Sequence, residues 1–88
     1  MRDAVIVSTA RTPLTKAARG SFNNTLAPTL GAHAVRAAVE RAGLEGGEID
    51  DVLFGAAMQQ GSQTMNIGRL VALRAGLPVT VPGMSIDR

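Results

Sequence analysis

Three short runs of strand-like sequence, separated by helical patterns, constrain the fold of this 88-residue chain more than any other feature. Residues 4–10 and 52–58 are almost continuously apolar, as is typical of strands buried on both faces of a sheet. Residues 83–87 alternate in polarity and are predicted to be a third strand. Helices are predicted between the strands, at about 28–42 and 66–75. This order makes two βαβ units, which predict an α/β fold with a parallel sheet.

The two predicted helices carry their own boundary signals. Pro28 suits the first turn of the first helix, and Gly43 suits its end. Asn66 is a suitable N-cap for the second helix, and Gly76 is a suitable stop. Apolar residues of the first helix gather on one face, and they are Leu30, Ala34, Val35, Ala38, Val39 and Ala42. The first helix therefore has an apolar side to lay on a sheet.

The predicted sheet does not look complete. If the strands are added in one direction, right-handed crossovers place both helices on the same face. The other face would then be bare, whereas parallel sheets are found almost only with both faces covered. We therefore expect residues 1–88 to be part of a larger domain, with the remainder in further chain or in a separate one. A sheet with the first strand in the middle would instead be a three-strand sandwich of marginal stability.

Composition excludes several classes of function. The net charge is +2 without a cluster of Lys or Arg, and Phe22 and Phe54 are the only aromatic residues, which argues against nucleic-acid binding. The chain has no cysteine, and its single histidine, His33, cannot build a metal site alone. No apolar stretch approaches the roughly 20 residues that span a bilayer, and no signal-peptide pattern opens the chain. We expect a cytoplasmic protein that binds neither nucleic acid nor membrane, with a core of aliphatic side chains.

Several segments, in order along nearly the whole chain, resemble the thiolase family. They are residues 4–13 (a strand with an Arg-Thr-Pro turn), 19–22 (a Gly-x-Phe loop), 30–32 and 40–43 (the ends of the first helix), 51–55 (the second strand), 66–69 (an Asn-x-x-Arg segment) and 81–88 (the strand that carries the family nucleophile). Each segment is short, but the ordered set is specific.

The resemblance implies a thiolase-like αβαβα layered fold of two similar halves. Residues 1–88 would be a partial N-terminal thiolase domain that supplies the first strand-helix-strand-helix-strand. The complete protein would be an acyl-CoA C-acyltransferase that makes or cleaves 3-ketoacyl-CoA by ping-pong acyl transfer through a Cys thiolate. That Cys would follow Arg88, and the other catalytic groups of the family, a His, an Asn and a second Cys, come later. This segment would therefore hold no catalytic, substrate-binding or metal-binding residue, and would be inactive alone.

The resemblance also implies partners and a metabolic setting. Coenzyme A thioesters would be the substrates and no further cofactor would be needed. The expected setting is fatty-acid metabolism, including β-oxidation, and the expected assembly is a homodimer or homotetramer. The acyl-chain preference and the direction of the reaction depend on pocket segments that this chain does not contain.

Six polar residues near the predicted strand ends are candidates for a supporting role. Gln59, Gln60, Asn66 and Arg69 follow the second strand, while Asp87 ends the third strand and Arg88 follows it. We expect these residues to support the nucleophile loop or to lie at an oligomer interface, with ordinary capping as the alternative. His33 and the loop residues Arg11, Lys16 and Arg19 are expected to be solvated or at a subunit contact rather than bound to CoA phosphates.

Two rival functions remain open at this point. One is a non-catalytic, thiolase-like lipid-binding or scaffold module. The other is a small nucleotide-binding α/β domain, which is disfavoured because the turn after the first strand has no Gly-rich phosphate loop.

Overall fold

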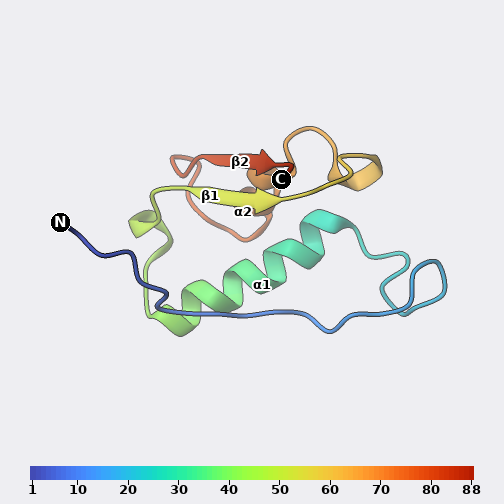
Figure 1. Ribbon diagram of the computed structural model, residues 1–88, viewed down its shortest axis with the longest axis horizontal. Helices are drawn as coiled ribbons and strands as arrows, with labels where there is room; N and C mark the ends of the chain where they lie inside the picture. Colours follow the sequence, from blue (N-terminus) through green and yellow to red (C-terminus); the bar gives the residue numbers. More distant parts are fainter.

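The computed structural model describes residues 1–88 and contains two helices and one parallel sheet. The elements, in chain order, are α1 (Ala27–Ala42), β1 (Val52–Gly55), α2 (Ile67–Arg74) and β2 (Gly83–Ile86) (Figure 1). Single turns of 3-10 helix, η1 (Gly46–Glu48) and η2 (Gly61–Gln63), lie in the loops before and after β1. The α/β class and the parallel pairing are confirmed.

The sheet has two strands, paired in register from Val52 opposite Gly83 to Gly55 opposite Ile86. β1 was predicted to run to residue 58, but it ends where its partner ends. The last ladder bond runs from the Ala56 N–H to the Ile86 carbonyl, at 2.9 Å. Residues beyond it have no strand beside them, and a strand without a partner cannot continue its ladder.

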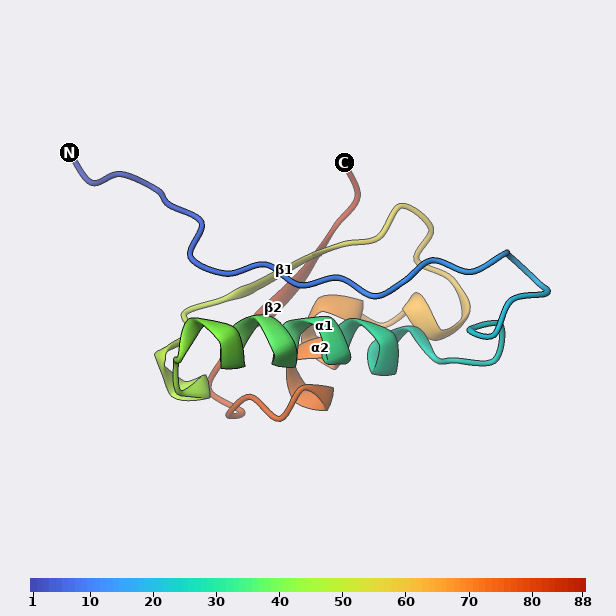
Figure 2. The same ribbon diagram turned by 90° about the horizontal axis from the view of Figure 1, so that it is seen from below.

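The prediction of a first strand at residues 4–10 is wrong. This stretch pairs with no strand and instead runs along α1 (Figures 1 and 2). The Ser8 hydroxyl donates to the Ala38 carbonyl at 2.7 Å, and the Arg41 guanidinium donates to the Thr9 carbonyl at 2.8 Å. Val5, Ile6 and Val7 are 72–86% exposed. β-branched composition favours a strand, but a strand needs a partner, and no backbone hydrogen bond joins this stretch to β1.

The helix α1 forms where its sequence signals predict. Pro28 lies in its first turn, and Gly43 ends it in the left-handed conformation with φ 70°. Gly31 and Ala32 are its buried residues. A Cβ atom at Gly31 would lie 2.8 Å from both the Phe54 ring and a Val71 methyl group, so α1 packs closely on β1 and α2.

The two faces of the sheet differ in cover. Figure 2 shows both helices on the same side of β1 and β2, as predicted. Val52 and Phe54 are buried and half-buried on the helix side. Their neighbours along the strands, Leu53, Met84 and Ile86, are 60%, 49% and 38% exposed. Because side chains alternate between faces along a strand, one whole face of the sheet is bare.

The core is small and aliphatic, as the composition predicts. Its nine buried apolar residues are Ala32, Val52, Ala56, Ile67, Val71, Ala72, Ala75, Leu77 and Val81. The three largest side chains that are fully buried are Ile67, Val71 and Val81. Two of these belong to α2, so α2 is the element around which the rest of the chain packs.

Candidate functional site

The start of α2 touches β2 backbone to backbone. A Cβ atom at Gly68 would lie 2.2 Å from the Met84 carbonyl oxygen, and one at Gly83 would lie 2.7 Å from the Gly68 carbonyl oxygen. Neither distance leaves room for a side chain. Glycine at both positions therefore allows the helix and the strand to meet at this distance.

A closed set of hydrogen bonds reinforces this contact. The Asn66 amide nitrogen donates to the Gly83 carbonyl at 2.9 Å, and the Ser85 hydroxyl donates to the Asn66 amide oxygen at 3.0 Å. The Gly68 N–H donates to the Ser85 hydroxyl at 3.2 Å. Asn66 thus uses both ends of its amide, and Ser85 both donates and accepts. We call Asn66, Gly68, Gly83 and Ser85 the α2–β2 clasp.

The capping role of Asn66 differs from the prediction. Asn66 occupies the N-cap position of α2, but its side chain does not cap the helix. Its backbone is left-handed, with φ 61°, a conformation that Asn tolerates better than most residues. The side chain consequently turns to β2. Ser85 supplies the oxygen that accepts the N–H of Gly68, in the first turn of α2.

Arg69 holds the chain that leads into β2. Its guanidinium donates to the carbonyl of Val79 at 3.0 Å and to the carbonyl of Val81. Val81 is 2% exposed, so one of these bonds is made to a residue of the core. Arg69 therefore ties α2 to the segment just before β2, while the α2–β2 clasp ties α2 to the strand itself.

The other four predicted residues lie outside this arrangement. Gln59 and Gln60 are exposed in the loop after β1, and Asp87 and Arg88 are exposed after β2. No hydrogen bond of their side chains is present. Because the strands are parallel and end in register, both pairs follow the same edge of the sheet. The structure thus brings Asn66 to β2 and Arg69 to the segment that leads into it, while a supporting role for all six residues stays a prediction.

Sequence reasoning did not identify Ser85, Gly68 or Gly83. One signal was available: a glycine inside a helical pattern costs stability and usually has a packing reason. A second signal was the spacing of Gly83 and Ser85. Residues two apart lie on the same face of a strand, so the Ser85 hydroxyl shares its face with a glycine that has no side chain. A polar side chain on a helix-covered face needs a hydrogen-bond partner.

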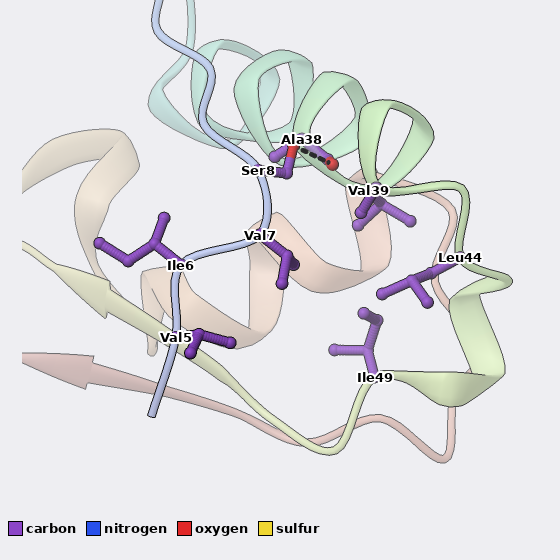
Figure 3. Close-up of a pocket in the computed structure, with 9 residues that line it drawn as sticks. Val5, Ile6, Val7, Ser8, Ala38, Val39, Leu44 and Ile49 are labelled. Atoms are coloured by element: carbon purple, nitrogen blue, oxygen red, sulfur yellow. Dashed lines mark hydrogen bonds between the residues drawn. The ribbon is translucent and has the colours of Figure 1, made fainter. Parts of the chain in front are cut away.

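An apolar hollow lies apart from the clasp, where residues 5–8 pass the carboxyl end of α1 (Figure 3). Its volume is about 300 Å³, and eight of its nine lining residues are apolar. Ser8 is the exception, and its hydroxyl is already bonded to the Ala38 carbonyl. The hollow therefore has no free polar side chain to orient a ligand.

The structure contains neither a metal-binding group of side chains nor a membrane-spanning helix. It holds no group of three or more His, Asp or Glu side chains that could bind a metal ion, and it has no cysteine. His33 is exposed on α1, far along the chain from the clasp. No helix is both long enough and apolar enough to cross a bilayer. What the structure provides is a strand held firmly at a defined distance from the start of a helix.

Comparison with known proteins gives consistent matches. The family model for the thiolase N-terminal domain matches residues 4–88. The chain is 43% identical over 88 residues to a 3-ketoacyl-CoA thiolase of Bacillus subtilis (strain 168), covering 100% of this chain and 22% of that protein. It is 42% identical over 88 residues to one of Saccharophagus degradans, covering 99% of this chain and 22% of that protein. The chain therefore spans about a fifth of the length of the curated relatives that it matches.

Proposed function

This chain belongs to the thiolase family, and from that premise we propose that it is part of an acyl-CoA C-acyltransferase that makes or cleaves 3-ketoacyl-CoA. The observation that carries the proposal is the match along the whole chain, at 42–43% identity, to proteins named 3-ketoacyl-CoA thiolase. The family match over residues 4–88 supports it.

The proposed chemistry is ping-pong acyl transfer through a Cys thiolate that follows β2 in the longer protein. In the cleaving direction the thiolate adds to the 3-keto carbonyl, and the bond between carbons 2 and 3 breaks. The acetyl-CoA carbanion leaves and takes up a proton, and the acyl group remains on the Cys as a thioester. A CoA thiol then loses its proton, attacks this thioester and releases the Cys thiolate. In the synthetic direction the acceptor is the carbanion of an acyl-CoA. CoA thioesters are the substrates, and no other cofactor is proposed.

The role proposed for this chain is structural support of the reacting Cys. Asp87 and Arg88 follow β2 directly, and Gln59 and Gln60 follow β1 at the same edge of the sheet. We assign these four residues, with Asn66 and Arg69, to support of the nucleophile loop or to an interface between subunits. The bare sheet face bearing Leu53, Met84 and Ile86 favours cover by the rest of the polypeptide, since parallel sheets are normally covered on both faces.

The proposal extends to assembly and setting. The complete enzyme would be a homodimer or homotetramer in the cytoplasm, working in fatty-acid metabolism such as β-oxidation. The oligomeric state and the metabolic setting follow from the family resemblance. The molar mass in solution tests the first, and the substrate range tests the second.

The decisive experiment expresses the longest reading frame that begins with these 88 residues and measures its CoA-dependent cleavage of 3-ketoacyl-CoA substrates of several chain lengths. We expect turnover, and a loss of about a thousandfold or more when the first cysteine after Arg88 is changed to alanine. The 88-residue chain alone serves as a control and should show no turnover.

A different result would favour the non-catalytic alternative. If the longer protein binds acyl-CoA without turning it over, and no cysteine closely follows β2, the proposal is wrong and a lipid-binding or scaffold module is the better description.

A further inference from the structure

We propose that Asn66 and Ser85 are positioning residues that set where the backbone goes as it leaves β2. The inference rests on the proposed function, because it matters only if the reacting Cys follows this strand. It goes further by naming a residue, Ser85, and a mechanical role that neither the family match nor the sequence pattern assigns.

The distance between α2 and β2 has a steric lower limit. The contact of Gly68 with Met84 leaves no space for even a methyl group, so the helix can approach no closer. A steric stop sets a minimum distance, but it does not prevent the strand from moving away from the helix or sliding along it. Directional bonds are needed for that.

The α2–β2 clasp supplies those directional bonds at two points of the short strand β2. Asn66 binds the carbonyl of Gly83, the first residue of β2, and the Ser85 hydroxyl binds Asn66 and the Gly68 N–H from the third. Two points of attachment fix both the position and the direction of the strand. Only Ile86 separates Ser85 from the exposed end at Asp87.

Within residues 1–88, few other bonds hold this end of β2. The strand pairs with β1 alone, and its opposite face is bare, with Met84 49% and Ile86 38% exposed. Removing the Ser85 hydroxyl would leave the Gly68 N–H without an acceptor and the Asn66 amide oxygen without a donor. Among residues 1–88, only the ladder to β1 would then fix the strand end.

A reacting group that follows this strand is sensitive to such a change. A displacement of about 1 Å at a reacting centre can lower the rate by about a hundredfold. We expect a smaller effect, about tenfold, because the β1 ladder and the Gly68 stop remain.

The experiment uses the complete enzyme and four single variants. Ser85→Ala removes the hydroxyl, and Ser85→Thr keeps it. Asn66→Asp retains the shape of the side chain but replaces the donor to the Gly83 carbonyl by an oxygen. Thr64→Ala is the matched control, because the Thr64 hydroxyl donates to the Gly61 carbonyl at 2.9 Å just before α2 and makes no hydrogen bond with β2. Each is assayed well below its unfolding temperature for kcat, KM and the rate at which iodoacetamide alkylates the reacting Cys.

We expect Ser85→Ala and Asn66→Asp to lower kcat about tenfold and to slow alkylation severalfold, with KM within about twofold of the wild type. Ser85→Thr should keep more than about half of kcat, because the hydroxyl remains, and Thr64→Ala should match the wild type. This pattern separates positioning from stability, since loss of stability alone lowers the amount of folded enzyme but not the reactivity of the Cys in it.

Each contrary outcome has a distinct meaning. An inactive wild-type enzyme overturns the proposed function and this inference with it. An active wild type, with Ser85→Ala and Asn66→Asp at wild-type kcat and alkylation rate, overturns the inference alone. If Ser85→Ala does not fold, Asn66→Asp decides by the same two measurements.

Discussion

Residues 4–10 and the strand β2 both pass close to a helix, but they are held in different ways. The first stretch has the stronger β-forming composition, yet only two side-chain hydrogen bonds fix it to α1, and Val5, Ile6 and Val7 remain largely exposed. β2 has a ladder to β1, a backbone contact at Gly68 and the α2–β2 clasp. The comparison teaches that neighbours, rather than intrinsic preference, decide which apolar run becomes a strand in this chain.

Among the substitutions that test this comparison, Gly68→Ala is expected to lower the free energy of unfolding the most. The new methyl group would need the space that the Met84 carbonyl occupies, at 2.2 Å, so α2 and β2 must separate and the α2–β2 clasp must open. We expect a loss of about 3 kcal/mol or more in the free energy of unfolding, measured by urea denaturation. For a core this small, such a loss amounts to most of the stability.

Gly47→Ala is the matched control for that substitution. Nothing lies within 4 Å of a Cβ atom at Gly47, and its φ is not in the left-handed region. The change should therefore be neutral or stabilising by up to about 1 kcal/mol, because alanine restricts the unfolded chain. Similar losses for the two variants would show that the backbone contact between α2 and β2 is not what holds this region.

A pair of identical substitutions gives the next largest effect and compares the two regions directly. Val71 on α2 is 0% exposed, and Val5 is 75% exposed. Val71→Ala removes two buried methyl groups and leaves a small cavity, so we expect a loss of about 2 kcal/mol. Val5→Ala should change stability by less than about 0.5 kcal/mol.

Thermal and urea unfolding of the two variants measure whether Val71 and Val5 contribute differently to stability. Equal losses for Val71→Ala and Val5→Ala would mean that residues 4–10 are packed as firmly as α2 in solution. The distinction between a held strand and a loose stretch would then be wrong.

The same comparison explains how far the sequence could predict the structure. α1, α2 and the two formed strands were predictable because their signals are local: periodic apolar residues, Pro28 at a helix start and Gly43 at a helix end. The conformation of residues 4–10 was not predictable, because an apolar β-branched run indicates a preference for strand but does not show whether another strand is available to pair with it.

In the candidate site, too, local positions were predictable and long-range contacts were not. Asn66 and Arg69 were placed correctly near the start of the second helix, since that position follows from local pattern. Their contacts with Gly83, Ser85 and Val81 depend on how α2 lies on β2, which is a long-range property. The prediction of Asn66 as a side-chain cap failed because its left-handed backbone turns the amide towards β2.

The smallest expected effect comes from Ser8→Ala, which removes one of the two bonds that fix residues 4–10. The Ser8 hydroxyl donates to the Ala38 carbonyl at 2.7 Å, in a partly buried position. One such bond contributes about 0.5–1 kcal/mol, and here it stabilises only the local contact. We therefore expect the free energy of global unfolding to change by less than about 0.5 kcal/mol, while tryptic cleavage after the exposed Arg11 becomes about two- to fivefold faster.

The matched control is Ser21→Ala, an exposed serine in the same N-terminal region whose hydroxyl makes no hydrogen bond, and it should leave the cleavage rate unchanged. The acceleration of cleavage after Arg11 can be expressed as a free energy of opening. If Ser8→Ala lowered the free energy of global unfolding by the same amount, residues 4–10 would unfold together with the core. A loose stretch instead opens on its own. Cleavage that rises without a change in global unfolding would show that the two bonds to α1 restrain the N-terminal run without making it part of the unit built by α2 and β2.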